Sequence, residues 1–483
     1  MTSTTTSGVD CSTFPTTERI FGWIEHLTGL GHRKTGTPQG RASADFIAAE
    51  LRGFGLDDVT IETAPTPCPT VHDQQLSIAG RDIACFWVNG TGRAAKLGHF
   101  RSELPDVEFV YLGHGWAEDY EGIDVTGKVV VCDVEFLNGA TSSIRERYPR
   151  AEAYDPDGSL QEKRNKYDIY SPYNWPDNFF HAQLRGAAGF VGILLNYMDC
   201  HNYNEDYTEN GEILGVEAME IPAVWVSRTD GEAIRREIRT GNGSTFGSLL
   251  VDVEYQLADA LNVQAILPGL SSDIILVHSH HDAVFAGAVQ DASGVSEVLA
   301  LAEYFAALPL EERPATFMFA ATDTHFTDYI GHHAFLDERR RLEQRIILDL
   351  CIEHVGKEVE LGEDNQAIET GHVEPRLVYI SDEADLYSVV KDAFVAHDLT
   401  RTFFLPVAHQ PGPDETPYVF RPDEVVSDAY YFAEAGIPVV SLVAAQMYLF
   451  HPSDTIDRVP VDQLRPVGLA FAQIAAAAAE RLR

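Results

Sequence analysis

Long apolar runs are absent from this sequence of 483 residues. No run of about 18 apolar residues occurs, which is the length that a membrane-spanning helix requires. The N-terminal stretch MTSTTTSGVDCSTFPTTER also lacks the apolar segment of a secretory signal. These absences lead us to expect a cytoplasmic protein without a membrane partner.

Basic residues and paired cysteines are scarce as well. The chain has 35 Lys and Arg against 74 Asp and Glu, a formal net charge of −39, and a field of this sign repels nucleic acid. None of the six cysteines forms a CxxC pair, which argues against a zinc ribbon and against a disulfide-rich secreted scaffold. We therefore expect no nucleic-acid partner, and we leave the formation of a homo-oligomer open.

The sequence does contain enough apolar material for a large core. Hydrophobic residues make up 45% of the chain, and its length suits two domains or one domain with an insertion. Short β-rich runs such as EFVYLG, KVVVCDV and AVWVSR occur within residues 100–257. We expect this segment to be inserted between residues 1–99, the first part of an α/β domain, and residues 258–483, the remainder of that domain.

An α/β pattern follows residue 258. DIILV, ATFMFA, RIILDLCI and IPVVSLV are patterns of buried strands, whereas SGVSEVLALAEYFAAL and LRPVGLAFAQIAAAAAERL have helical spacing. TERIFGWIEHLTGL and ASADFIAAELRGF, near the N-terminus, have helical spacing too. Apolar strands that alternate with helices predict a mostly parallel sheet with helices on both faces.

One short span, HSHHDAVFAGAVQDASG at residues 278–294, concentrates histidine and aspartate where a buried strand ends. Ligands of open α/β sheets bind at that edge. His280 and Asp282 lie on the same side of an extended chain, and a metal-bound imidazole usually has a carboxylate behind it. Asp291 follows in a loop, and its two oxygens can bridge two cations. The span therefore predicts a metal site.

Two later strand ends supply further candidate ligands. CIEHVG offers Glu353 and His354, and FHPSDT offers His451 with Asp454 three residues later. Histidine nitrogen combined with carboxylate oxygen suits zinc, and also manganese or iron. We therefore expect a divalent metal cofactor, with zinc preferred, as one or two ions.

These motifs resemble those of the zinc peptidases related to bacterial leucyl aminopeptidase and glutamate carboxypeptidase II. HHDAVFAGAVQDASGV is similar to the family pattern H-x-D…G-A-x-D-N-A-S-G, and SDAYYFAEAGIPVVSL with FHPSDT resembles the ending S-D-x-x-x-F…G-I-P…Y-H-x-x-x-D-T. RKTGTPQGRASADFIAAELRGFGLDDVTIE resembles the N-terminal motif of the family. GIDVTGKVVVCDV with LRGAAGFVGILL resembles the protease-associated domain that is often inserted in these enzymes.

The resemblance implies a phosphorylase/hydrolase-like α/β fold with a protease-associated-like insert. It also implies roles for individual residues. His280, Asp291 and Glu353 would hold one metal ion. Asp291 would bridge to a second ion, which His451 also binds, and Asp282 would support His280 in catalysis.

The sequence departs from the family pattern at two places. The family usually has Asp where Glu353 stands, and the choice of Glu353 over Asp349 depends on the following HVG, which matches M-V-G in the family. In the family, the strand that corresponds to ATFMFA leads into a Glu-Glu pair. In this sequence the two positions are occupied by His325 and Phe326, in the segment THFTDYIGHHAF. Because phenylalanine cannot bind a metal, the site holds one ion unless a nearby histidine completes a second set. The candidates for this are His281, His325, His332 and His333.

Histidine at the base position suits proton transfer near neutral pH. We therefore expect a metal-dependent hydrolase of an amide or peptide bond in a small molecule or short peptide, with a metal-bound water and His325 as general base. The loss of both glutamates leaves two alternatives open. One is a metalloenzyme of the lyase, cyclase or hydratase type on the same scaffold, and the other is a non-catalytic binding homologue.

Overall fold

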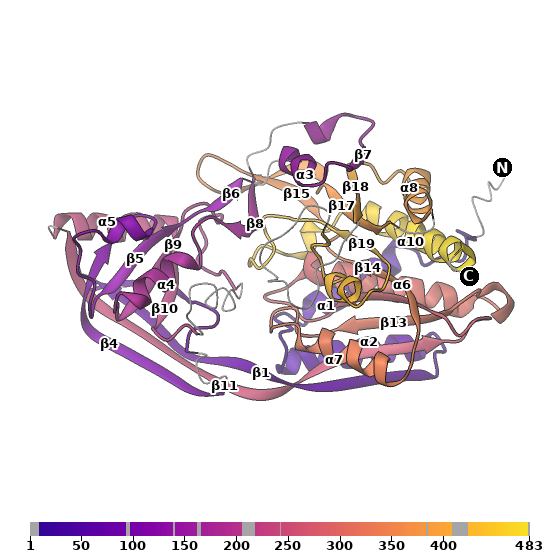
Figure 1. The fold of residues 1–483 in the computed structure, drawn as a ribbon, viewed down its shortest axis with the longest axis horizontal. Coiled ribbons are helices and arrows are strands. Elements are labelled where there is room, and N and C mark those ends of the chain that lie inside the picture. Colours follow the sequence, from indigo (N-terminus) through magenta and orange to yellow (C-terminus); the bar gives the residue numbers. More distant parts are fainter. Residues whose placement is uncertain are drawn as a thin grey trace.

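Most strands of the protein join one mixed sheet that runs through the whole molecule (Figure 1). The computed structural model describes residues 9–92, 97–138, 141–161, 166–204, 218–241, 243–382, 385–407 and 424–481. In spatial order the sheet contains β3 (Phe86–Trp87), β10 (Ala223–Ser227), β9 (Gly189–Leu194), β5 (Val129–Val134), β4 (Gly98–Tyr111), β11 (Ser244–Leu267), β13 (Thr316–Thr322), β12 (Ile274–His280), β14 (Ile346–Ile352), β19 (Val439–Val443), β17 (Arg376–Ser381), β18 (Thr402–Val407) and β7 (Glu152–Tyr154).

Six strands lie beside this order or outside it. β1 (Asp58–Ile78) pairs with β11 and with β2 (Arg81–Ile83), and two small sheets are formed by β15 (Lys357–Leu361) with β16 (Ala367–Val373) and by β6 (Phe136–Asn138) with β8 (Tyr167–Pro172).

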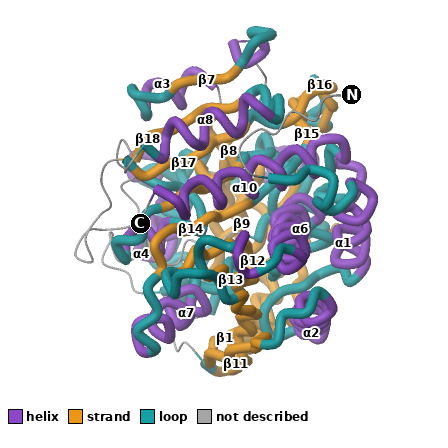
Figure 2. Tube along the Cα trace, turned by 90° about the vertical axis from the view of Figure 1, so that its right-hand side faces the viewer, coloured by secondary structure: helices purple, strands orange, loops and turns teal. Residues whose placement is uncertain are grey.

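Helices cover both faces of the sheet (Figure 2). They are α1 (Thr17–Gly29), α2 (Pro38–Gly53), α3 (Thr141–Arg147), α4 (Asp177–Leu184), α5 (Arg228–Thr240), α6 (Gly294–Ala307), α7 (Ile330–Arg341), α8 (Leu386–Ala396), α9 (Tyr430–Glu434) and α10 (Val461–Arg481). In the described part of the chain, no helix is both long and apolar enough to cross a membrane.

The predicted α/β class is confirmed. β12 pairs in parallel with β13 and β14, and β14 pairs in parallel with β19. In the other half of the sheet, β4, β5, β9 and β10 are parallel as well. Parallel neighbours end at the same edge of the sheet, so residues that follow β12, β13, β14 and β19 are brought together.

The central strands are apolar on both faces because helices pack on each face. Ile275 and Val277 of β12 belong to a core that includes α6, α1 and α10, whereas Ile274 and Leu276 belong to a second core with α7 and α9. Successive side chains of a strand point to opposite faces. This double burial explains why β12 reads as a continuous apolar run in the sequence.

β1 and β11 form a long antiparallel ribbon that connects the two halves of the sheet (Figure 1). β1 begins at Asp58 and continues through three alternate prolines, Pro65, Pro67 and Pro69. Alternate residues turn their N–H positions to one side, and proline lacks an N–H, so this side must be the free edge of the ribbon. The prolines thereby prevent another strand from pairing at this edge.

β11 spans residue 257, the predicted boundary between the insert and the second part of the α/β domain. β7, which lies in the predicted insert, pairs with β18 at the far edge of the sheet. The two parts therefore share strands and a sheet. The predicted division at residues 99 and 257 stays a prediction.

Glu297 is a buried carboxyl group inside the helical layer of this fold. It lies on α6, it has no exposed surface, and neither of its oxygens has a hydrogen-bond partner among the described residues. Its surroundings include Phe14 and Gly468 of α10, which lacks a side chain where Glu297 approaches. Burial raises the pKa of Glu297 well above its ordinary value of 4.5. The folded protein therefore holds this carboxyl group in its neutral form.

We expect the substitution Glu297→Gln to remove a pH dependence of stability. The folded state binds a proton at Glu297 that the unfolded state releases above pH 4.5, so the wild-type free energy of unfolding falls as pH rises from there. Relative to Glu297→Gln, the free energy of unfolding of the wild type should fall by about 1.4 kcal/mol for each pH unit. Urea unfolding between about pH 5 and pH 7 measures it. Glu303→Gln, a more exposed change on α6, should behave as wild type, and equal slopes for all three proteins would contradict the account.

Candidate metal centre

His280 ends β12 and has no exposed surface. Its Nδ1 lies 2.9 Å from the backbone oxygen of Asp282 and 3.3 Å from the carboxylate of the same residue. Both neighbours are acceptors, so Nδ1 carries a proton and Nε2 of the neutral ring has a free lone pair. No partner for Nε2 exists within the described ranges. His280 is therefore prepared to bind a cation through Nε2, with Asp282 behind it.

Asp282 also fixes the segment that follows β13. Its carboxylate accepts the backbone N–H groups of His325 and Phe326, both at 3.2 Å. Burial raises the pKa of Asp282, but the hydrogen bond from His280 and the neighbouring imidazoles outweigh burial and lower it to about 2. Asp282 thus links the ends of β12 and β13 as a carboxylate.

Four side chains bring their ligand atoms within 4.8 Å of one another: His280, His325, Glu353 and Asp428. They follow β12, β13 and β14 or precede α9. Two imidazoles and two carboxylates are donors that suit zinc, manganese or iron. Three members of the group are buried and His325 is partly exposed, and Nε2 of His280 points to no protein partner that the structure describes. These residues fit a divalent cation.

The structure places Glu353 and Asp349, the two acids between which the sequence analysis chose a metal ligand, in different surroundings. Glu353 lies in the group, where its Oε1 accepts hydrogen bonds from Cys351 at 3.0 Å and from the backbone of Asp428 at 3.1 Å. Burial, and then the charge of Asp428, raise the pKa of Glu353 well above its ordinary range. Asp349 lies outside the group and contacts Nε2 of His278 at 3.0 Å.

Asp428 is the member of the group to which sequence reasoning assigned no role. Its carboxylate lies 2.8 Å from Nδ1 of His325 and 2.8 Å from Nε2 of His332. Burial opposes ionisation, but the two imidazoles lower the pKa of Asp428 well below its ordinary value. The signal in the sequence is the S-D pair of SDAYYFAEAGIPVVSL, which matches the family pattern quoted above.

His325 packs flat against His280, with ring centroids 4.0 Å apart and an interplanar angle of 10°. Its Nε2 lies 3.1 Å from the amide nitrogen of Gln290. Burial lowers the pKa of an imidazole, but the charge and the hydrogen bond of Asp428 dominate and raise the pKa of His325 to about 10. The predicted base is therefore in the group, next to a predicted metal ligand.

Asp291 and His451 lie outside the four-residue group. Asp291 is fully buried, and its carboxylate accepts the Ser279 hydroxyl and the backbone N–H of His354, the latter at 3.1 Å. His451 accepts the backbone N–H of Ser453 on Nδ1 at 3.0 Å. The predicted metal-binding roles of Asp291 and His451 stay predictions.

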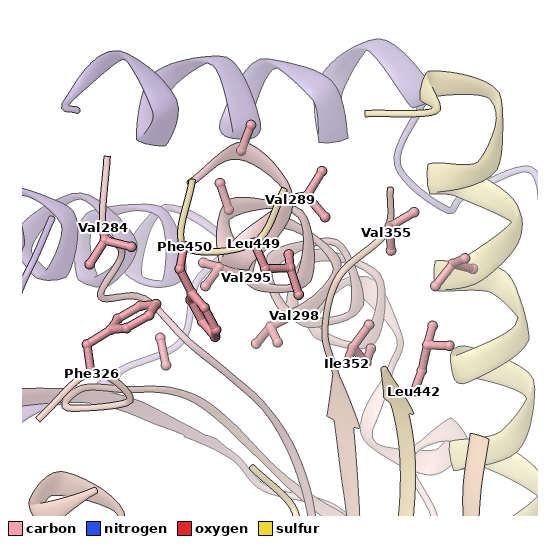
Figure 3. Close-up of a cluster of buried hydrophobic side chains, with 14 of the residues drawn as sticks. Val284, Val289, Val295, Val298, Phe326, Ile352, Val355, Leu442, Leu449 and Phe450 are labelled. Atoms are coloured by element: carbon pink, nitrogen blue, oxygen red, sulfur yellow. The ribbon is translucent and has the colours of Figure 1, made fainter. Parts of the chain in front are cut away.

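Phe326 presents a ring at the position where the resemblance to the zinc peptidases predicts a second carboxylate. It is 6% exposed and packs against the rings of His325 at 4.8 Å and Phe450 at 5.6 Å. Figure 3 shows Phe326 and Phe450 side by side, with Val284 next to them. This side of the site is therefore apolar.

Arg33 supplies positive charge behind the site, a role that sequence reasoning missed although RKTGTPQGR contains the residue. The guanidinium is fully buried and donates to the backbone oxygens of Ala286 at 2.8 Å and Gly287 at 3.0 Å. Burial lowers the pKa of Arg33 to about 10, and the charges of Asp282 and Asp291 oppose that shift. Arg33 therefore stays charged and holds the loop between these two acids.

We expect His280→Ala to weaken metal binding at least tenfold, because loss of a direct ligand costs no less than loss of its support. Dialysis against defined zinc concentrations, followed by elemental analysis, measures the change. The matched control is His281→Ala, since His281 is equally buried but its Nε2 donates to Leu261 at 2.8 Å. Equal metal affinity in the two variants would remove His280 from the site.

Comparisons with known proteins agree with this geometry. Residues 262–348 match the family model described as Peptidase family M28. No curated protein sequence matches the chain.

Three solved structures share the fold over almost the whole chain. The peptidase M28 precursor from Shewanella amazonensis SB2B superimposes with a TM-score of 0.66 at 19% identity, covering 96% of this chain and 93% of its own. The zinc aminopeptidase BSAP from Bacillus subtilis gives 0.63 at 17% identity, covering 96% and 95%. The aminopeptidase from Aneurinibacillus sp. strain AM-1 gives 0.59 at 18% identity, covering 98% and 95%. The expected resemblance to zinc peptidases is thus confirmed: residues 262–348 match the model of Peptidase family M28, and the whole chain shares its fold with zinc aminopeptidases.

Proposed function

We propose that the protein is a metal-dependent hydrolase that cleaves an amide or peptide bond in a small molecule or short peptide. The observation that carries this proposal is the group of His280, His325, Glu353 and Asp428, the first three of which lie at the carboxyl ends of parallel strands. It lies against a segment that matches peptidase family M28. Ligands of α/β sheets bind at this edge.

Three residues would hold the metal ion: His280 through Nε2, Glu353, and Asp291. When bound, a divalent ion such as zinc polarises the substrate carbonyl and lowers the pKa of water. Asp282 keeps the proton of His280 on Nδ1, so that Nε2 stays available. Phe326 adds no donor on its side, and we therefore expect one ion.

His325 is the residue that would accept the proton of the attacking water and deliver it to the leaving amine. Its Nε2 faces the amide of Gln290, and an amide N–H requires a lone pair on that atom. Asp428 raises the pKa of His325 to about 10 in the protein alone. Positive charge bound beside an imidazole lowers its pKa, so a bound ion would favour the neutral form of His325 that accepts a proton.

One observation favours a second candidate function. The position of the usual second glutamate is filled by the buried ring of Phe326, so a reaction other than peptide hydrolysis, of the lyase, cyclase or hydratase type, would use the same metal and the same proton acceptor. A panel of aminoacyl amides, peptidyl amides and short peptides separates the two. Hydrolysis of none of these by zinc-loaded protein would favour the second candidate.

We expect His325→Ala to lower kcat by a factor of about 10² to 10⁴, which is the usual contribution of a general base, while bound zinc stays unchanged. Steady-state kinetics and elemental analysis on the same preparation measure both quantities. His333→Ala is a suitable control because His333 lies nearby on α7 and contacts Tyr431. Full activity in His325→Ala would exclude the role of base, and loss of zinc would make His325 a ligand.

A further inference from the structure

The carboxylate of Asp428 is shared by two imidazoles, and we propose that Asp428 is a positioning residue for His325 and does not bind the metal. This inference rests on the proposed function, because it concerns the proton acceptor of that reaction. It also assigns a role to His332, which holds the other oxygen of the same carboxylate.

Both oxygens of Asp428 already have nitrogen partners. Oδ1 lies 2.8 Å from Nδ1 of His325, and Oδ2 lies 2.8 Å from Nε2 of His332. An ionised carboxylate only accepts, so each of these nitrogens must donate a proton. Asp428 therefore has one imidazole on each oxygen, which is the arrangement of a carboxylate that orients histidines.

The second nitrogen of His325 leads to the same assignment from the opposite side of the ring. Gln290 places its amide nitrogen 3.1 Å from Nε2, and this group can only donate. The lone pair of His325 is therefore on Nε2 and its proton on Nδ1, toward Asp428. Such an arrangement fixes the tautomer and the orientation that a proton acceptor needs.

His332 and the backbone of Asp428 hold the carboxylate in place. His332 is fully buried on α7, and its Nε2 also lies 3.0 Å from the hydroxyl of Thr322 at the end of β13. The backbone N–H of Asp428 donates to Glu353 at 3.1 Å. A side-chain substitution at position 428 therefore leaves the contact with the predicted metal ligand Glu353 intact.

The first test is Asp428→Asn, which keeps the size and removes the charge. We expect zinc content to stay the same, KM to change little, and kcat to fall by a factor of about 10² to 10⁴, as when a histidine base loses its orienting carboxylate. Loss of zinc would make Asp428 a ligand and overturn the proposal. Unchanged kcat would overturn it as well.

A matched pair at position 332 tests the other half of the arrangement. His332→Gln can keep an N–H directed at Asp428, whereas His332→Leu cannot. We expect kcat to fall more in His332→Leu, by tenfold or more relative to His332→Gln, with equal zinc content. Equal kcat values in the two variants would remove His332 from the proposal.

Nitrogen-15 spectra of histidine-labelled, zinc-loaded protein test the tautomer without any substrate, with His325→Ala used for assignment. We expect His325 to carry its proton on Nδ1 in the wild type and to lose that preference in Asp428→Asn. A wild-type proton on Nε2 would overturn the proposal. If the protein hydrolyses no amide, the proposed function fails, whereas zinc content and the spectra still decide whether Asp428 binds metal or orients His325.

Discussion

Burial of several carboxylates in one place is the constraint on which the site depends. Asp282, Asp291, Glu353 and Asp428 are all at most 1% exposed, and removing an unpaired charge from water costs several kcal/mol per ion. The fold supplies partial compensation from Arg33 and from imidazoles, and it directs backbone N–H groups at the oxygens. The raised pKa of Glu353 indicates that this compensation is incomplete in the protein alone. A bound divalent cation would complete it.

Much of the fold could be predicted because its signals are local. The first half of β12, residues 274–277, is apolar at every position, since helices cover both faces of the strand, and such a run is visible without any partner. The pairing of His280 with Asp282 also depends on neighbours in sequence. The ribbon of β1 was harder to predict in full, because Pro65 and Pro67 normally indicate the end of a strand and only the position of β1 at a free edge makes them compatible with one.

The remainder of the site could not be predicted because its contacts join distant segments. Asp428 meets His325 across 103 positions of sequence and His332 across 96. The chain gives no local reason to pair them, since each position alone suits a surface or a core residue. Arg33 likewise lies 253 positions from Ala286, whose backbone oxygen it binds. Only the parallel order of the strands, which places their carboxyl ends at one edge, makes these residues neighbours.

The pair of His325 and Phe326 changes the charge that the site can hold. The zinc-peptidase pattern that the sequence resembles has two carboxylates where we place these residues, and by that alignment this chain has two fewer negative charges there. One divalent cation brings two positive charges, and unbalanced buried charge is costly. Loss of the two carboxylates therefore removes the compensation for one ion, while Phe326 removes an oxygen donor and packs on Phe450 instead. Both effects favour one ion over two. The contact between His325 and Asp428 then retains an oriented proton acceptor beside that ion, because the carboxylate holds the proton of His325 on Nδ1 and leaves Nε2 free to accept one.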